Sequence, residues 1–398
     1  MALRRLRLVS TLGTMALIAG GFGLAGTGLA SAASSTLFVS PGGSASNTDT
    51  SCATAKYSTI QSAGNAATPG DTVRVCHGTY HEAVLVQKRL QLEGSNATVD
   101  AAGLLNGIGF PVGIMVLSSW TQVSGFSVEN AGAEGILAAT YPPGSPTVTH
   151  LTIEHNSVHN NDLAGAIAAN DPECAAQGQV PGDCGEGLHL LSVTHSQAVD
   201  NKVWGNSGGI LLTDEFGPNH DNLVAGNWVA NNLADCGITI PSHVAGNGVF
   251  HNVIRDNVVI GNGTQGDGGG ILIAAAGPGM ASWGNLITGN FVAGNGLAGV
   301  TIHSHAPGQN VSDNTIVGNF IGKNNLLGDG GLGVGGTATD TKTTGILVSS
   351  AVIPQHLTIL DNTIWNNTYG VWLSSNITAH GLGDNTFKHV TQKVFVGP

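Results

Sequence analysis

A degenerate repeat runs from about residue 150 to the C-terminus and limits the fold more than any other feature of the chain. Its first half reads Asn-x-apolar-x-x-Asn, as in residues 201–206 and 257–262, and its second half reads Gly-apolar-x-apolar, as in residues 209–212 and 270–273. A unit this short cannot bury its own apolar face, so it must stack on copies of itself. Asn tolerates left-handed backbone, and Gly turns corners without a Cβ. The repeat therefore predicts an all-β parallel solenoid.

Strand parity predicts which side chains fill this solenoid. The first and third residues after each Gly are apolar, and alternate residues of a strand point to opposite faces. The first of these positions holds Ile210, Ile238, Ile271 and Val300. We expect these four side chains to form one inward ladder across consecutive coils, and the residues between the apolar positions to face outward.

The composition fits this architecture. The 398 residues include 60 Gly, while only 5% are aromatic and 10% are charged. A solenoid coil needs small apolar residues inside and turn residues at its corners, whereas a globular domain of this length would carry more charge. The pattern predicts one continuous domain of roughly nine or ten coils, each rising about 4.8 Å.

The first 32 residues have the features of a secretory signal peptide. Arg4, Arg5 and Arg7 precede an apolar stretch over residues 8–29, and a small-x-small cleavage site ends at Ala32. We expect this segment to be removed and the mature protein to be secreted or extracellular. The pattern leaves the Sec and twin-arginine export routes open.

The charge balance limits the partners of the mature chain. Three of the 13 basic residues lie in the first 32 residues, which leaves ten Lys and Arg against 25 Asp and Glu, a formal net charge of −15. Such a surface is a poor partner for nucleic acid, for anionic membranes and for polyuronates without bridging cations. No later segment approaches 18 uninterrupted apolar residues. We expect a monomer that recognises a neutral or weakly charged polysaccharide or other glycan.

The N-terminal part differs from the repeats. Residues 33–100 are expected to hold a cap and the first coils, and residues 101–398 the repeats. Residues 57–67 predict a short helix with Ser58 as its N-cap, followed by a turn and strand over residues 69–75. A helix here would cover the open end of the first coil and its unpaired strand edges.

This cap and the coils behind it resemble the right-handed parallel β-helix proteins of the pectin-lyase-like superfamily, over residues 35–398. The resemblance implies a single right-handed parallel β-helix with a short N-terminal capping helix. It implies no single activity, because the superfamily includes polysaccharide lyases, glycoside hydrolases, pectin esterases, uronan epimerases, proteins of copper-site maturation, phage tailspikes and adhesins. The active-site motifs of epimerases, polygalacturonases and pectate lyases are absent; the string nearest the epimerase Asp-Pro-His-Asp, at residues 171–174, lacks its second half.

Five cysteines suit an exported protein with disulfides. We pair Cys52 with Cys76, which would fasten the cap to the first coil, and Cys174 with Cys184, which would close a Pro- and Gly-rich excursion. Cys236 is then left over, and we expect it to be a small buried hydrophobe.

The densest group of reactive residues predicts a catalytic site on the outer face of the middle coils. Asp214, Glu215, His220 and Asp221 lie within nine residues, and His243 falls one coil after Glu215 in the repeat register. Paired carboxylates beside a His suit polysaccharide cleavage, by hydrolysis or elimination. We expect Glu215 to act as the acid, with its pKa raised by a neighbouring carboxylate, and Asp214 as base or nucleophile. The alternative is that the aspartates only cap turns.

Neighbouring coils supply expected substrate contacts. These are Glu186 and His189 from the coil before, and His303, His305 and Trp372 from later coils. Other histidines, such as His150, His159, His356 and His389, are expected to be solvated or structural.

Two alternatives to catalysis stay open. Glu215, His243, His303 and His305 could bind Zn²⁺ or Cu²⁺, and apart from such a divalent cation we expect no cofactor. The protein could also be a non-catalytic glycan-binding or cell-envelope surface protein. An outward strip that includes Leu211, Leu272 and Trp372 would then stack on sugars or dock a partner.

Overall fold

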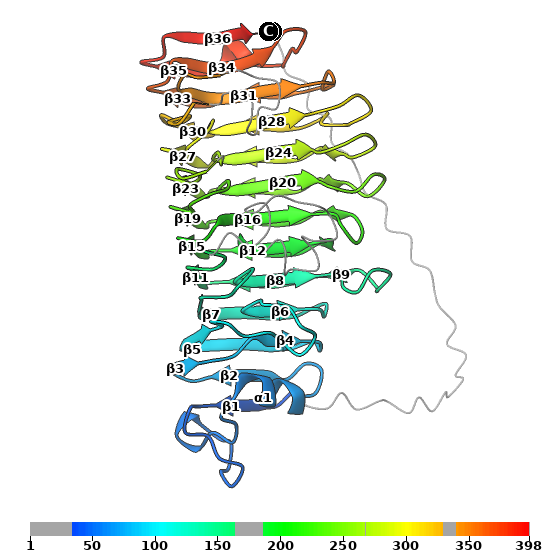
Figure 1. The fold of residues 1–398 in the computed structure, drawn as a ribbon, viewed down its shortest axis with the longest axis vertical. Helices are drawn as coiled ribbons and strands as arrows, with labels where there is room; N and C mark the ends of the chain where they lie inside the picture. Colours follow the sequence, from blue (N-terminus) through cyan, green and yellow to red (C-terminus); the bar gives the residue numbers. More distant parts are fainter. Residues whose placement is uncertain (1–33, 164–185, 267, 329–339, 398) are drawn as a thin grey trace, which may run out of the picture. The chain divides into compact units, whose positions relative to one another are not determined.

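Successive coils of the chain stack in parallel, as the repeat predicts (Figure 1). The structure is a computed structural model that describes residues 34–163, 186–266, 268–328 and 340–397. The predicted signal peptide at residues 1–32 lies outside the described residues, and so do Cys174 and Cys184. No helix of the described part is long and apolar enough to cross a membrane.

The Gly-apolar-x-apolar segments form an 11-stranded parallel sheet, which we name sheet B. Its strands, from the N-terminal end, are β4 (Val84–Val86), β6 (Ile114–Val116), β8 (Ile136–Ala139), β12 (Glu186–Leu191), β16 (Gly208–Thr213), β20 (Ile238–Ser242), β24 (Ile271–Ala275), β28 (Val300–Ser304), β31 (Thr344–Ser350), β34 (Tyr369–Ser374) and β36 (Gln392–Gly397). The sequence pattern undercounts the coils because β4 and β36 lack the opening Gly.

The Asn-x-apolar-x-x-Asn segments belong to a 20-stranded sheet, sheet A, to which most coils give two short strands separated by a corner. The strands before the corner are β10 (Thr152–Glu154), β14 (Gln197–Val199), β18 (Leu223–Ala225), β22 (Val253–Arg255), β26 (Leu286–Thr288), β29 (Thr315–Val317) and β32 (Thr358–Leu360). The strands after it are β11 (Ser157–His159), β15 (Lys202–Trp204), β19 (Trp228–Ala230), β23 (Val258–Ile260), β27 (Phe291–Ala293), β30 (Phe320–Ile321), β33 (Thr363–Trp365) and β35 (Thr386–Lys388). The N-terminal strands are β1 (Thr36–Val39), β2 (Thr72–Val75), β3 (Gly78–Tyr80), β5 (Gln91–Asp100) and β7 (Gln122–Glu129).

A third sheet, sheet C, lies between sheet B and sheet A in the middle coils. It contains five two-residue strands: β9 (Val148–Thr149), β13 (Val193–Thr194), β17 (Asn219–His220), β21 (Val249–Phe250) and β25 (Ser282–Trp283). The residue after each strand turns the corner into sheet A with a positive φ, at His150, His195, Asp221, His251 and Gly284.

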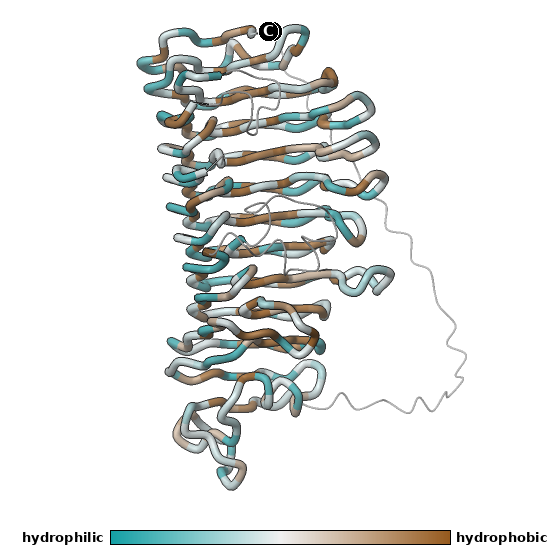
Figure 2. Tube along the Cα trace, viewed as in Figure 1, coloured by the Kyte–Doolittle hydropathy of each residue, from teal (hydrophilic) through white to brown (hydrophobic). Residues whose placement is uncertain are grey.

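The predicted inward ladder is confirmed. Ile210 pairs with Ile238, Ile238 with Ile271, and Ile271 with Val300, all in parallel register. These four side chains are at most 1% exposed and belong to one core that runs through all the coils. Figure 2 shows apolar residues recurring along the stacked strands. Burial of this core is the main favourable term in folding.

The prediction that Leu211, Leu272 and Trp372 form an exposed strip is wrong. They are 2%, 7% and 2% exposed. Leu272 belongs to a small cluster with Leu297, and the Trp372 ring lies 6.0 Å from the ring of Phe395. Parity decides only which face of a strand a side chain takes, whereas exposure depends on what covers that face. Trp372 therefore offers no open ring face to a sugar.

The repeated asparagines stack into ladders. In the ladder through Asn227 and Asn257, the Oδ1 atom of Asn257 accepts hydrogen bonds from the backbone N and the Nδ2 of Asn227, both at 2.9 Å. The Nδ2 of Asn257 donates to the carbonyl of Val224 and to the Oδ1 of Asn290 in the next coil. The same pattern links Asn206, Asn232 and Asn262 at a second corner. Each amide therefore satisfies buried backbone groups that a corner leaves unpaired.

The N-terminal cap contains the predicted helix, but the helix N-cap lies one residue later than predicted. Helix α1 spans Ile60–Ala66, and its N-cap is Thr59, whose side chain accepts from the Ser62 N–H, so the predicted cap at Ser58 is wrong by one residue. The predicted disulfide between Cys52 and Cys76 is present. Cys236 is a free, buried thiol, as expected. Two 3₁₀ turns complete the described elements, η1 (Cys52–Thr54) and η3 (Leu382–Asp384).

We predict that Asn257→Ala lowers the free energy of unfolding by at least about 3 kcal/mol, because several buried polar groups lose their partners at once. Chemical denaturation measures this loss. The control is Asn65→Ala on the exposed side of α1, which should change stability by less than about 0.5 kcal/mol. Equal effects of the two substitutions would contradict a structural role for the ladder.

Candidate functional site

The predicted contact between Glu215 and His243 is present. Glu215 follows the end of β16, and His243 follows the end of β20 in the next coil. The Nδ1 atom of His243 lies 2.6 Å from Oε1 of Glu215. The repeat register thus placed an acid and an imidazole side by side, as expected.

Asp214 lies in a different environment from the one predicted. Its carboxylate is fully buried and accepts hydrogen bonds at 2.7 Å from the Ser242 hydroxyl and from the backbone N–H groups of His243 and Gly248. It therefore holds the loop that follows β20. These contacts agree with the alternative that the aspartates cap turns. The prediction that Asp214 lies on an open outer face is wrong.

The predicted order of the two pKa values is reversed. Burial raises the pKa of Asp214. Burial also pushes the pKa of Glu215 upward, but the hydrogen bond from His243 and its charge outweigh burial, so the pKa of Glu215 is lowered. A neighbouring carboxylate alone would raise the pKa of Glu215, but the imidazole of His243 is in direct contact with Glu215 and has the larger effect.

His189 belongs to a buried polar chain on the outer side of sheet B. Its Nδ1 lies 3.1 Å from Oε1 of Glu134, and its Nε2 lies 2.7 Å from the hydroxyl of Thr213. Glu186, in the same strand as His189, is 1% exposed. Sequence reasoning missed Glu134, although Glu134-Gly135 and Glu186-Gly187 open their strands with the same dipeptide.

Access to this group of residues is narrow. The side chains of Glu134 and His189 are at most 1% exposed, and that of Glu215 is 2% exposed. His243 is the most open member, with 17% of its side chain exposed. Most of this polar chain is thus enclosed rather than presented to a polymer.

The alternative metal set does not gather into one site. Its members form two pairs: Glu215 with His243, and His303 with His305, whose rings lie 4.5 Å apart. Ala276 occupies the coil between the pairs, since Ala275 is in register with Ser304. Burial, reinforced by the neighbouring His305, lowers the pKa of His303 to about 3. Among the described residues, these four do not form a cluster of metal ligands.

His220 and Asp221 lie at a separate place, the corner between sheet C and sheet A. The Nδ1 of His220 is 2.7 Å from Oδ2 of Asp221, and the Nε2 of His195, one coil earlier, is 3.6 Å from the same oxygen. Ligand atoms of these three residues all lie within 4.8 Å of one another. Sequence reasoning missed His195, although Val-Thr-His recurs at residues 148–150 and 193–195.

Stacked rings extend from this cluster along several coils. Trp120 stacks on His150 at 3.9 Å with an interplanar angle of 9°, and His150 stacks on His195 at 5.6 Å. Farther on, His220 stacks on Phe250 at 4.8 Å. His150 therefore has a stacking role, in line with its expected structural role.

A pocket of about 470 Å³ adjoins the cluster. Its lining includes Trp120, Thr152, His195, Gln197 and Asp221. The Trp120 indole is 57% exposed and sits on a backbone with φ of 62°, a conformation that is unusual for a large side chain. The pocket thus combines an open aromatic ring with hydroxyl, amide, imidazole and carboxylate groups.

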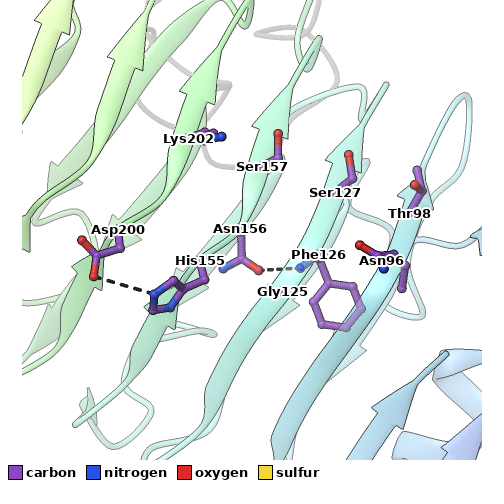
Figure 3. Close-up of a pocket in the computed structure, with 11 residues that line it drawn as sticks. Asn96, Thr98, Gly125, Phe126, Ser127, His155, Asn156, Ser157, Asp200 and Lys202 are labelled. Carbon is purple, nitrogen blue, oxygen red and sulfur yellow. Dashed lines mark hydrogen bonds and ion pairs between the residues drawn. The ribbon is translucent and has the colours of Figure 1, made fainter. Parts of the chain in front are cut away.

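A second pocket of about 500 Å³ opens on sheet A (Figure 3). Thr98, Ser127, Ser157 and Lys202 line it from four successive strands. Two further lining residues, His155 and Asp200, form an ion pair at 3.8 Å in which the imidazole is charged only when protonated.

Comparison with known proteins defines the class and then the family. The stacked parallel sheets make the chain a parallel β-helix protein. It belongs to the family described as "Periplasmic copper-binding protein (NosD)", whose profile matches residues 118–265, 150–334 and 259–397. No curated protein matches the sequence.

Solved structures share the fold at low sequence identity. The lacto-N-biosidase of Eubacterium ramulus is 10% identical with a TM-score of 0.50, over 91% of this chain and 68% of that one. The A-module of a mannuronan C-5 epimerase of Azotobacter vinelandii is 14% identical with a TM-score of 0.45, over 83% and 89%. A surface adhesin of Streptococcus pneumoniae is 13% identical with a TM-score of 0.34, over 85% and 89%. At 10% identity, the likeness to the lacto-N-biosidase extends to the fold alone.

We predict that the enclosed His303 makes the protein less stable in acid. Burial lowers the pKa of His303 to about 3 in the folded protein, against 6.5 for a free imidazole. Between these two pH values the unfolded chain binds more protons than the folded one, so the stability of the fold decreases as the pH is lowered. From pH 7 to pH 5 this one imidazole should cost about 2 kcal/mol.

Unfolding free energies at both pH values measure this effect. His303→Gln should remove about 2 kcal/mol of the acid sensitivity. The control His380→Gln, at an exposed His, should retain the full sensitivity. An unchanged pH dependence in His303→Gln would refute the prediction.

Proposed function

We propose that the protein binds a copper-class metal ion through His195, His220 and Asp221. The observation that supports this most directly is that ligand atoms of these three residues lie within 4.8 Å of one another at the surface. Imidazole nitrogen and carboxylate oxygen are ligands that Cu²⁺ and Zn²⁺ accept, and Cu²⁺ binds more tightly in such sites. Solvent can complete the coordination, since the His195 and Asp221 side chains are 50% and 42% exposed.

Family membership supports the choice of metal. The family is described as copper-binding and periplasmic, and its profile covers the cluster. A metal role outside the cytoplasm also agrees with the predicted signal peptide. We therefore place the protein in the periplasm or outside the cell.

We predict that the purified mature chain binds Cu²⁺ more tightly than Zn²⁺, as measured by isothermal titration calorimetry. His195→Ala and Asp221→Ala should each weaken the tightest Cu²⁺ binding at least about ten-fold, or about 1.4 kcal/mol. His356→Ala is the matched control: this His has the same left-handed backbone, with φ of 50°, and pairs with Asp313 at 2.9 Å. A loss of Cu²⁺ affinity in the control as large as in the site variants would reject the site.

Carbohydrate binding at the adjoining pocket is the second candidate function. The observation that favours it is the open Trp120 indole beside the hydroxyl and amide groups of Thr152 and Gln197. An aromatic face with a few polar groups around it is a usual arrangement for small-ligand recognition. We propose binding rather than cleavage, because the carboxylate of Asp214 is engaged by its loop and Glu215 is largely enclosed.

A glycan array identifies the neutral oligosaccharides that the wild-type protein binds. We predict that Trp120→Ala weakens binding to these oligosaccharides at least about ten-fold, or about 1.4 kcal/mol. Trp283→Ala is the control, since this ring belongs to the same stacked row but lies outside the pocket. Binding should persist with EDTA present, which separates it from the metal site. Unchanged sugar affinity in Trp120→Ala would exclude this pocket as the sugar site.

A further inference from the structure

One outward column of sheet A joins the second pocket to a row of exposed aromatic rings. Its members occupy the same register position in eight successive strands, from β5 to β30, and we name the column the sheet A strip. They are Thr98, Ser127, Ser157, Lys202, Trp228, Val258, Phe291 and Phe320. The strip therefore follows the axis of the β-helix without a break in register.

The N-terminal half of the strip is polar and hollowed. Thr98, Ser127, Ser157 and Lys202 line the pocket of about 500 Å³, and Figure 3 shows their side chains on neighbouring strands. The Lys202 ammonium is exposed and makes no hydrogen bond or ion pair with any described residue. These groups can hydrogen-bond to a polyhydroxylated ligand. The Ser127 hydroxyl already lies 3.0 Å from Nε2 of His159, and the Ser157 hydroxyl accepts from Nε1 of Trp204 at 3.4 Å, so the Lys202 ammonium has the most donors left for a ligand.

The C-terminal half of the strip is apolar and open. Trp228, Phe291 and Phe320 are 36%, 42% and 52% exposed, and the half-buried Val258 separates the first two rings. Aromatic rings in the other outward columns are more enclosed, as with Trp204, which stacks on His159 at 4.5 Å. Three of the four exposed Trp, Tyr and Phe rings among the described residues lie in this column, the fourth being Trp120, and such a gathering indicates a binding surface.

The dimensions of the strip suit a linear polymer. Seven steps between coils span roughly 34 Å at about 4.8 Å each. A pyranose unit in an extended polysaccharide advances by a distance close to one coil spacing. A chain laid along the axis could therefore place successive sugar rings against successive strands, with hydroxyl contacts at one end and ring stacking at the other.

We propose that the sheet A strip binds a linear, neutral polysaccharide parallel to the β-helix axis. Charge favours a neutral chain: the mature protein is acidic, and in the polar half Lys202 is offset by the nearby Asp200. The proposal rests on the carbohydrate function proposed above but uses different residues, so the two can fail separately.

The test is affinity gel electrophoresis of the full mature chain in glucomannan, xylan and hydroxyethylcellulose, with polygalacturonate as the acidic comparison. Wild type should be retarded by at least one neutral polymer and not by polygalacturonate. The double variant Trp228→Ala/Phe320→Ala should weaken that retardation at least ten-fold, and Lys202→Ala should weaken it by a smaller factor.

A matched control is the double variant Leu105→Ala/Ile353→Ala, since these side chains are 64% and 55% exposed and lie outside the strip. It should bind as wild type does. Thermal unfolding of every variant separates loss of binding from loss of fold, and Phe320→Tyr, which keeps a ring at the position, should restore most of the affinity that Phe320→Ala loses.

Three other outcomes would contradict the proposal. Retardation lost in Trp120→Ala but kept in Trp228→Ala/Phe320→Ala excludes the strip and keeps the first pocket. The absence of retardation by every neutral polymer, or preference for polygalacturonate, excludes a neutral polysaccharide at the strip. A concentration-dependent dimer in light scattering that Trp228→Ala/Phe320→Ala abolishes assigns the surface to self-association instead.

Discussion

Hydrogen bonding between stacked asparagines is the constraint on which the rest of this structure depends. A coil must turn sharply, and each turn leaves buried backbone groups without a partner in their own strand. Asn227 and Asn257 supply these partners from one coil to the next and fix the register at the same time. With the register fixed, Ile238 and Ile271 meet in the interior ladder. The same register aligns the outward columns that form the candidate sites.

The reactive groups of the molecule fall into two environments with different chemistry. On the outer side of sheet B, His189 and Glu215 are enclosed, and their hydrogen bonds to neighbouring polar groups are short. At the corner after sheet C, His195 and Asp221 are open to solvent and can accept a ligand. Buried polar groups with hydrogen-bond partners stabilise one arrangement of the chain. A solvent-exposed cluster such as His195 and Asp221 can instead bind a ligand. This difference in access favours metal or glycan binding over polymer cleavage.

Contacts in the candidate sites could be predicted from the sequence where two residues hold the same position in successive copies of a repeat that the sequence shows. The contact between Glu215 and His243 followed from register alone. The cluster of His195 with Asp221 did not, although both residues hold the same corner position in successive coils, because the two-residue strands of sheet C are too short to show a repeat pattern in the sequence. The directions in which the pKa values of Asp214 and Glu215 shift could not be predicted from the sequence either, because they depend on which hydrogen-bond donors contact each carboxylate.

The sequence by itself determined the parallel β-helix, its inward ladder and the disulfide between Cys52 and Cys76, because these follow from periodicity and from pairing within a short N-terminal segment. Only the tertiary structure decided which outward side chains meet solvent. Trp372 and Phe320 both face away from the core, yet one is 2% and the other 52% exposed. Periodicity fixes the direction of a side chain, whereas exposure depends on segments that are distant in the sequence and cover one face but not another.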